Sequence, residues 1–363
     1  MLAGRRATLH DVAGAAGVSV SAVSKVVRNA YGVSPQMRAR VTEAIEQLGY
    51  RPNAGARAMR GLSYTIGVVL TDLMSPFQPE LAQGIGDELE KTTYQDVIVT
   101  AGQSPQRQRR RIEALMDRQV AGLVLVAPTL EVTWIEELAR TVPVVTVALH
   151  GAAKNFDTVA HDQRLGARLV VDYLVSAGHR RIVHTSMPAS TVDGSFVLSH
   201  TARRYAFEES MREHGLQPGV IETSYSEEGG YEAALEAFDR AEPPTAIFAG
   251  ADIAALGVLR AAEERRIRVP EDLTVVGYDN IYISTINRVS LTTVDQSGHH
   301  TGEASVRLLL ERINGRSEPQ QVVLTPELIV RSTSGPPPTD SEVAIIERRR
   351  TVSRDASGTQ RPS

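Results

Sequence analysis

The segment from Thr8 to Ser19, Thr-Leu-His-Asp-Val-Ala-Gly-Ala-Ala-Gly-Val-Ser, constrains the fold of this chain more than any other. Thr8 and Asp11 have the spacing of a capping box, so a helix is predicted to begin after Thr8. Gly17 would end that helix in a tight turn, and Ser19 would cap a second helix over residues 20–29. Two helices joined in this way form a helix-turn-helix, whose second helix enters the major groove of DNA.

A third helix is predicted after Ser34, because this capping serine precedes Pro35 and proline suits the first helical position. Residues 1–50 are therefore predicted to form an all-α headpiece. Residues 51–62 would follow as a hinge helix or linker, too short to hold a helix alone. The predicted apolar stripe of the third helix comprises Met37, Val41, Ala44, Ile45 and Leu48.

Charge is divided unevenly along the chain. The whole sequence has 39 Lys and Arg against 43 Asp and Glu, a formal net charge of −4. Residues 1–62 hold nine basic and three acidic side chains, which leaves the remainder at −10. A basic head on an acidic body predicts a polyanionic partner at one end only. The alternative is chance clustering on a solvated surface.

From Thr65 onward, short Val- and Ile-rich runs alternate with amphipathic segments. This alternation continues over roughly 260 residues and is typical of α/β folds with parallel sheets. Because that length exceeds one compact core, two lobes with a cleft between them are predicted. A tail rich in Pro, Ser, Thr and Arg, residues 334–363, is predicted to be disordered. The predicted strands are 65–70, 96–100, 122–125, 144–147, 181–184, 245–248 and 274–277.

The sequence also argues against several classes of protein. It contains no cysteine, which excludes disulfides, thiolate metal sites and cysteine nucleophiles. No run approaches the roughly eighteen apolar residues of a membrane span. No apolar run follows Arg5 and Arg6, so we expect no signal peptide and a cytoplasmic protein. No Walker, Gly-x-Ser-x-Gly or His-Glu-x-x-His motif occurs, and Gly84-Ile-Gly86 is a glycine pair within a helix. We therefore predict no enzymatic activity, no cofactor and no metal.

The order of short motifs along the chain resembles that of the LacI/GalR (lactose-repressor) family of transcription regulators. The N-terminal pieces are Asp-Val-Ala, Gly-Val-Ser, Val-Ser-Lys-Val, Val-Ser-Pro and Gly-Tyr-Arg-Pro-Asn. Downstream come Ser-Ala-Gly-His-Arg-Arg-Ile from Ser176, Val-Gly-Tyr-Asp from Val276 and Leu-Thr-Thr-Val-Asp-Gln from Leu291. The resemblance runs from Thr8 to Arg331.

This resemblance implies a helix-turn-helix headpiece, a hinge helix and a core similar to the sugar-binding proteins of the periplasm. It also implies a homodimer on a pseudo-palindromic DNA operator. The core, residues 63–333, would divide into an N-lobe of about residues 63–164 and 295–322 and a C-lobe of about residues 165–292 and 323–331.

The resemblance assigns three residues of the second helix to base edges. Lys25 can donate hydrogen bonds to guanine, Ser21 can form hydrogen bonds with several bases, and Val20 can contact a thymine methyl group. The alternatives are a backbone-capping role for Ser21 and a phosphate contact for Lys25. Met59 matches a leucine that wedges into the minor groove, the alternative being contact with the dimer mate. The remaining candidates are Asn53 and Ala56 in the hinge segment and, for contacts to the DNA backbone, Arg28, Asn29, Ser34, Arg38 and Tyr50.

The resemblance also places a small-molecule effector site between the lobes. It implies that Arg203 grips ligand oxygens, that Asp279 accepts hydroxyl bonds and that Gln296 supplies an amide. Tyr225 would stack on a sugar face, and Phe77 would line the mouth. The alternatives left open are a structural ion pair for Arg203, a surface position for Tyr225 and a capping role for Asp279.

In the predicted effector-binding core, two positions and one segment depart from the family pattern. Ala148 and Ala251 stand where the family often has polar side chains, and residues 187–201 form a longer, Ser/Thr-rich stretch. Lost polar groups change the set of ligands, so a larger glycoside, a less polar metabolite and the absence of an effector all stay open, and no particular sugar is predicted. The sequence favours a repressor controlled by a carbohydrate-like effector, with induction and co-repression both open. The alternative is a solute-binding protein or carbohydrate-active enzyme on the same core.

Overall fold

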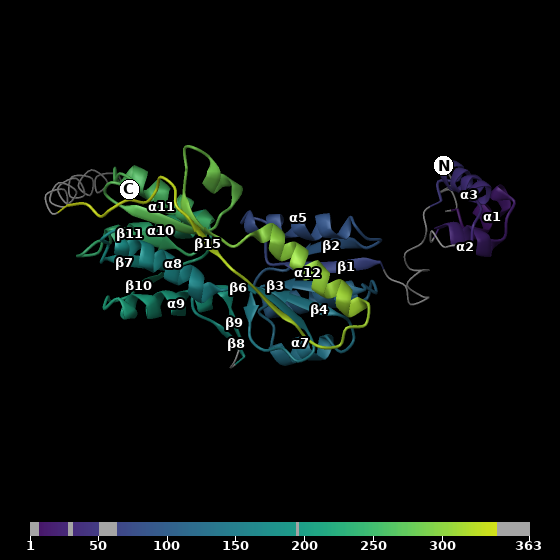
Figure 1. The fold of residues 1–363 in the computed structure, drawn as a ribbon, viewed down its shortest axis with the longest axis horizontal. Helices are drawn as coiled ribbons and strands as arrows, with labels where there is room; N and C mark the ends of the chain where they lie inside the picture. The colour runs from purple at the N-terminus through teal and green to yellow at the C-terminus, as the bar shows by residue number, and fades with distance from the viewer. Residues whose placement is uncertain (1–6, 28–31, 51–63, 194–195, 340–363) are drawn as a thin grey trace, which may run out of the picture. The chain divides into compact units, whose positions relative to one another are not determined.

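The computed structural model divides the chain into two compact units, residues 1–63 and 64–363 (Figure 1). The two units are described separately below. The predicted hinge segment, residues 51–62, lies outside the residues that the structure describes, which are 7–27, 32–50, 64–193 and 196–339.

The first unit contains the predicted helix-turn-helix. The Thr8 backbone N–H donates to the Asp11 carboxylate at 2.7 Å, and the Asp11 N–H donates to Thr8 Oγ1 at 3.3 Å, so the capping box is present. Gly17 ends the first helix with a φ of 64°. The helices of this unit are α1 (Leu9–Ala16), α2 (Val20–Val27) and α3 (Pro35–Gln47).

Buried side chains from all three helices form the headpiece core. The predicted stripe of α3 is confirmed for Val41 and Ala44, which are buried. It is wrong for Leu48, which is 40% exposed. The reason is that α3 ends at Gln47, and the turn at Gly49 (φ 57°) brings Tyr50 into the core instead.

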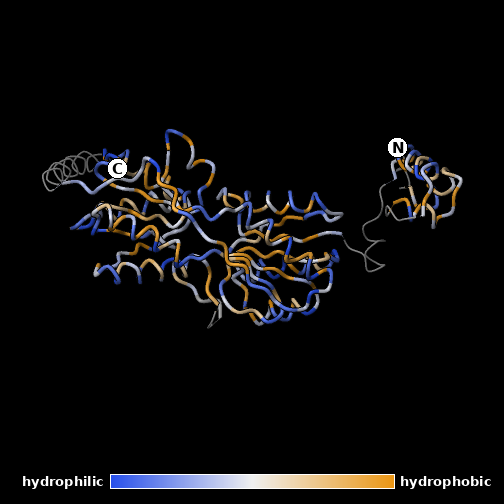
Figure 2. Tube along the Cα trace, in the orientation of Figure 1, coloured by the Kyte–Doolittle hydropathy of each residue, from blue (hydrophilic) through white to orange (hydrophobic). Residues whose placement is uncertain are grey.

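The second unit consists of two α/β lobes with sheets of parallel strands, which confirms the predicted fold class. Each predicted strand is present, with ends that differ by at most two residues. Figure 2 shows apolar residues concentrated along the strands and polar residues on the outer helices. Among the described residues, no helix has the length and apolar character that a membrane crossing requires.

The N-lobe is a six-stranded parallel sheet between two layers of helices. One face is covered by α5 (Phe77–Leu89) and α12 (Gly298–Ile313), the other by α6 (Pro105–Met116) and α7 (Val132–Leu138). The strands in spatial order are β14 (Gln321–Leu324), β6 (Asp157–His161), β4 (Val144–Val147), β3 (Gly122–Val126), β1 (Thr65–Leu70) and β2 (Gln95–Thr100).

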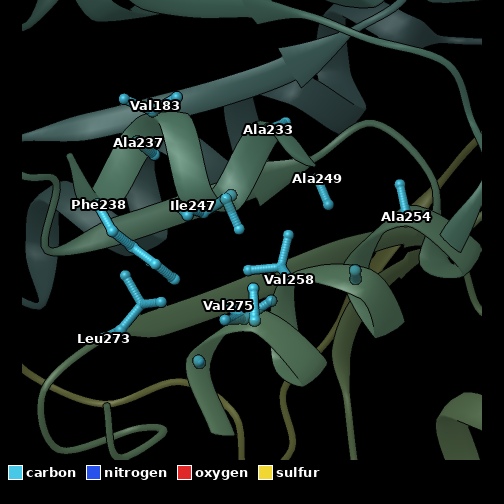
Figure 3. Close-up of a cluster of buried hydrophobic side chains, with 14 of the residues drawn as sticks. Val183, Ala233, Ala237, Phe238, Ile247, Ala249, Ala254, Val258, Leu273 and Val275 are labelled. Carbon is cyan, nitrogen blue, oxygen red and sulfur yellow. The ribbon is translucent and has the colours of Figure 1, made fainter. Parts of the chain in front are cut away.

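The C-lobe has the same layered plan, with one antiparallel edge strand. One face is covered by α8 (Gln163–Ser176) and α9 (Ser199–Glu213), the other by α10 (Glu227–Phe238) and α11 (Asp252–Glu264). Figure 3 shows the apolar cluster on the second of these faces. The strands in spatial order are β10 (Gly219–Glu222), β7 (Ile182–Ser186), β11 (Ala246–Ala249), β12 (Thr274–Asp279), β13 (Thr292–Asp295) and the antiparallel β15 (Glu327–Ile329).

The pairing of strands moves two predicted lobe boundaries. Because β13 pairs with β12, the C-lobe continues to Asp295 rather than to residue 292. Because β14 pairs with β6, the N-lobe continues to Leu324 rather than to residue 322. The chain therefore crosses between the lobes after β6, after β13 and after β14.

The predicted start of the disordered tail at Ser334 is too early. The Ser334 hydroxyl lies 2.8 Å from the Tyr173 hydroxyl and 2.7 Å from Thr292 Oγ1. The carbonyl oxygen of Gly335 lies 2.9 Å from His179 Nε2. These hydrogen bonds attach the beginning of the predicted tail to the C-lobe, and residues 340–363 lie outside the described part of the chain.

A third, small sheet was not predicted. It is antiparallel and contains β5 (Leu149–His150), β9 (Phe196–Leu198) and β8 (Thr191–Asp193) in that order. It accounts for part of the long stretch 187–201 noted in the sequence.

Candidate functional site

The outer face of α2 carries two of the side chains predicted to read bases. Ser21 and Lys25 are exposed, because Val23 and Val26 turn the opposite face of the helix into the headpiece core. Val20 is half-buried and packs against that core, so it presents less surface than predicted. The recognition surface that the structure describes is therefore centred on Ser21 and Lys25.

Two of the predicted contacts to the DNA backbone also have structural roles within the headpiece. Ser34 Oγ accepts the Met37 N–H at 3.2 Å and so caps α3. Tyr50 is 8% exposed and belongs to the apolar core. Their contacts with phosphates stay predictions, as does that of the half-buried Arg38. The other predicted DNA contacts lie outside the described residues: Arg28, Asn29, Asn53, Ala56 and Met59.

In the second unit, Arg203 lies at the centre of a buried polar cluster. This α9 side chain is 3% exposed. Its Nε donates to Gln163 Oε1 at 2.9 Å, and its Nη1 donates to the carbonyl oxygen of Gly250. The guanidinium also lies 3.5 Å from the ring centroid of Tyr278, a cation–π contact. Neighbouring groups thus hold the guanidinium in one orientation.

Asp279 and Gln296 contact each other within the same cluster. Gln296 Nε2 donates to Asp279 Oδ1, and both residues are 6% exposed. Burial raises the pKa of Asp279 well above its usual value, an effect that the positive charge of Arg203 opposes. Asp279 ends β12 and Gln296 follows β13, so both lie at the carboxyl ends of neighbouring parallel strands. In open α/β sheets, ligands bind at this edge.

Tyr225 and Phe77 belong to different lobes. Tyr225 comes from the C-lobe and packs directly on Gly250, where an added side chain would overlap the tyrosine ring. Phe77 begins α5 in the N-lobe and lies against Gly298, where an added Cβ would stand 3.3 Å from the phenyl ring. Tyr225 therefore borders the Arg203 cluster, because the carbonyl oxygen of Gly250 also accepts from Arg203, whereas Phe77 lies beside the segment that follows Gln296.

Three histidines near Arg203 were missed by the sequence analysis. Burial, together with the positive charge of Arg203, lowers the pKa of His150 to about 4, of His161 to about 3 and of His200 to about 4. These imidazoles are neutral near pH 7, where each can donate one hydrogen bond and accept another. His161 ends a parallel strand, so its position was open to prediction from the strand-end rule.

The two departures from the family pattern contribute backbone rather than polar side chains. Ala148 follows β4 with a φ of 61°, and its carbonyl oxygen accepts the Ser199 N–H at 3.1 Å. Ala251 precedes α11, is 4% exposed and supplies no side-chain cap. The neighbouring Asp252 is fully buried and accepts the Ser284 hydroxyl at 2.6 Å. Asp252 therefore stabilises the C-lobe itself.

Several buried polar atoms near Arg203 make no hydrogen bond within the described part of the chain, among them Gln163 Nε2, Tyr225 Oη and Tyr278 Oη. The other polar atom of the Gln163 amide, Oε1, binds Arg203. Buried amide groups in proteins are nearly always paired, so an oxygen of a bound ligand would complete this cluster. Across residues 7–27, 32–50, 64–193 and 196–339, no group of three or more His, Asp or Glu is arranged to hold a metal.

Comparisons with known proteins match both units. The family model of bacterial regulatory proteins, lacI family, matches residues 8–53, and the model of the periplasmic binding protein-like domain matches residues 171–334. Catabolite control protein A of Priestia megaterium is 32% identical over 327 residues, which are 89% of this chain and 97% of that protein. The ribose operon repressor of Escherichia coli (strain K12) is 31% identical over 335 residues, 90% of this chain and all of that protein.

Solved structures give the same result. The lac repressor dimer bound to operator and the anti-inducer ONPF has a TM-score of 0.78 and 27% identity, and the match covers 91% of this chain and all of that chain. These matches include the headpiece and the two-lobed core together, in one order. The matched proteins include an operon repressor and a lac repressor bound to its operator, and the matched family model is that of bacterial regulatory proteins. The chain therefore belongs to the LacI family of DNA-binding transcriptional regulators.

Proposed function

We propose that this regulator is a sequence-specific repressor that binds a pseudo-palindromic operator as a homodimer. This proposal rests on the exposure of Ser21 and Lys25 on α2, whose other face packs in the headpiece core. A two-fold dimer would present two copies of this helix to two symmetric half-sites. The similarity to the ribose operon repressor and to a lac repressor dimer on its operator supports both parts.

The proposed effector is a small, carbohydrate-like molecule that binds at the Arg203 cluster. Arg203 and Gln296 supply donors, Asp279 supplies an acceptor, and Tyr225 offers a ring for an apolar sugar face. Such an effector changes the affinity for DNA only through different affinities for two states of the protein. Induction and co-repression use the same residues with opposite sign, and both are compatible with this site.

Selection of bound genomic fragments tests the proposed function. We expect the full-length chain to enrich one inverted repeat, and the genes beside that repeat would suggest the effector. A chain lacking residues 1–63 should enrich no sequence while keeping the circular-dichroism spectrum of an α/β core. If the chain were a solute-binding protein, removing residues 1–63 would change neither its ligand binding nor its DNA binding, which would be absent from the start. If the full-length chain shows no preference over scrambled competitor, with or without candidate metabolites, the proposal is wrong.

The change Lys25→Ala should weaken binding to the operator more than binding to random DNA. A side-chain contact with a guanine edge contributes about 1–3 kcal/mol of discrimination, so we expect a loss of roughly tenfold or more in operator affinity. Fluorescence anisotropy at one salt concentration measures both affinities. Lys91, an exposed lysine on the core, provides the control Lys91→Ala, which should change neither. Equal losses on operator and random DNA would assign Lys25 to a phosphate.

A further inference from the structure

A strand that belongs to the C-lobe by chain order is built into the hydrophobic core of the N-lobe. β9 lies between β7 and α9, both C-lobe elements, yet it pairs antiparallel with β5, which directly follows the N-lobe strand β4. Phe196 and Leu198 of β9 are each 5% exposed and pack in the N-lobe cluster that α6 and α7 cover. The Phe196 ring centroid lies 6.2 Å from that of Phe156.

The joint between β5 and β9 is close-fitting. Gly151 leaves room for the phenyl ring of Phe196, because any side chain at residue 151 would overlap that ring. The Ser199 N–H donates to the Ala148 carbonyl oxygen at 3.1 Å, and His150 Nε2 lies 2.9 Å from Ser199 Oγ. Apolar packing, strand pairing and a side-chain hydrogen bond thus join the lobes at one place.

This joint adds a non-covalent connection to the three chain crossings. Two domains that are linked only by short crossing segments can open and close about those segments as a hinge. Opening at this joint would also expose Phe196 and Leu198 to water, which is unfavourable. We propose that β9 is an interlobe strap that holds the two lobes in a single relative arrangement when no effector is bound. This inference does not depend on the identity of the effector or of the operator.

Spin labels across the lobes test the strap. The chain contains no cysteine, so Glu137→Cys on α7 and Glu213→Cys on α9, both exposed, create the only labelling sites. Pulsed electron–electron double resonance on the full chain, diluted with unlabelled protein, measures the distribution of distances between the two labels. We expect one narrow distribution without effector, and a broader one that extends to longer distances in Phe196→Ala.

The matched control is Phe238→Ala. Phe238 is 4% exposed and lies wholly within the C-lobe cluster (Figure 3), so its loss also removes a buried ring but leaves the strap intact. That variant should keep the narrow distribution. Gly151→Ala should broaden it, because the added methyl group displaces Phe196.

If Phe196→Ala does not fold, the milder pair Phe196→Leu and Phe238→Leu gives the same comparison. A broad distribution in the unmodified sequence would overturn the proposal. So would distributions in the strap variants that are as narrow as those of the Phe238 controls.

Discussion

Gly84→Ala should lower the free energy of unfolding by roughly 3 kcal/mol, whereas Gly86→Ala should raise it by up to about 1 kcal/mol. Both glycines lie in α5. An added methyl group at Gly84 would overlap the backbone carbonyl oxygen of His299 in α12. At Gly86 an added Cβ has no neighbour within 4 Å, so alanine there only reduces the conformational freedom of the unfolded chain.

The opposite signs follow from how closely α5 and α12 approach each other. The contact is reciprocal, because an added side chain at Gly302 of α12 would overlap the carbonyl oxygen of Leu81 in α5. Backbone atoms give way less easily than side-chain tips, so the helices must separate and lose packing over the N-lobe core. Gly302→Ala should therefore lower the free energy of unfolding by about as much as Gly84→Ala.

Urea unfolding of the full chain, followed by circular dichroism, measures these differences. Gly86→Ala serves as the control for any general effect of alanine on α5. The packing argument is contradicted if Gly84→Ala and Gly86→Ala shift the free energy of unfolding in the same direction by similar amounts.

Local rules predicted the elements whose causes lie within a few residues. The capping box of Thr8 and Asp11, the turn at Gly17 and the cap at Ser34 involve neighbours in the sequence, and the structure has all of them. The buried strands with continuous Val and Ile runs were predicted for the same reason. The helical glycine pair at Gly84 was recognised, but its role depends on α12, more than 200 residues away, which no local pattern contains.

Elements that depend on distant partners were missed. The strand β6 begins with Asp157 and ends with His161, so it lacks the apolar run that marks a buried strand, and only its pairing with β4 and β14 defines it. The short strand β9 likewise depends on β5.

The same distinction between local and distant causes applies to the residues of the site. The motif resemblance supplied Arg203, Asp279 and Gln296, which the structure brings together. His150 lies on β5, and the pairing with β9 that brings it toward Arg203 is not local in sequence. His200 precedes Arg203 by three residues in α9, so its position beside Arg203 was open to prediction from helical spacing.

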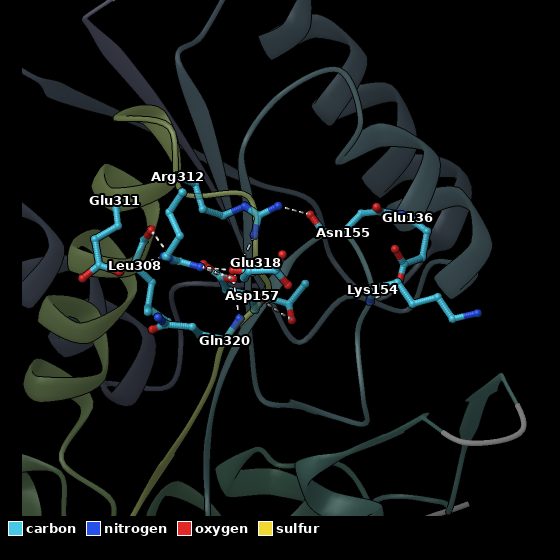
Figure 4. Close-up of polar contacts among 11 residues, drawn as sticks. Glu136, Lys154, Asn155, Asp157, Leu308, Glu311, Arg312, Glu318 and Gln320 are labelled. Carbon is cyan, nitrogen blue, oxygen red and sulfur yellow. Dashed lines mark hydrogen bonds and ion pairs between the residues drawn. The ribbon is translucent and has the colours of Figure 1, made fainter.

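Asp157→Ala should lower the free energy of unfolding by about 3–5 kcal/mol, because it removes one partner of a buried ion-pair network. Figure 4 shows this network. Asp157 is fully buried and accepts from Arg312 Nη1 at 3.1 Å, Arg316 Nη2 at 2.6 Å and the Gln320 N–H at 2.8 Å. Its loss would leave two guanidinium groups, whose side chains are 9% and 17% exposed, without their shared carboxylate.

The network also joins three segments of the N-lobe. Asp157 begins β6, Arg312 belongs to α12, and Gln320 directly precedes β14, which pairs with β6. Loss of the carboxylate therefore loosens the anchoring of both α12 and the edge strand. Hydrogen exchange of the amides in β14 should accelerate more than that of the amides in β10, the edge strand of the other lobe.

A surface ion pair with a similar N–O distance serves as a control. It separates the effect of burial on the free energy of unfolding from the effect of charge pairing. Arg164 Nη2 and Glu209 Oε1 lie 2.8 Å apart, but their side chains are 67% and 47% exposed. Water already solvates both groups, so Glu209→Ala should cost less than about 1 kcal/mol. The free energy of unfolding lost in Arg316→Ala should fall between the losses in Asp157→Ala and Glu209→Ala, because Arg312 still neutralises Asp157. If Asp157→Ala costs no more than Glu209→Ala in the same urea titration, the buried network does not stabilise the N-lobe.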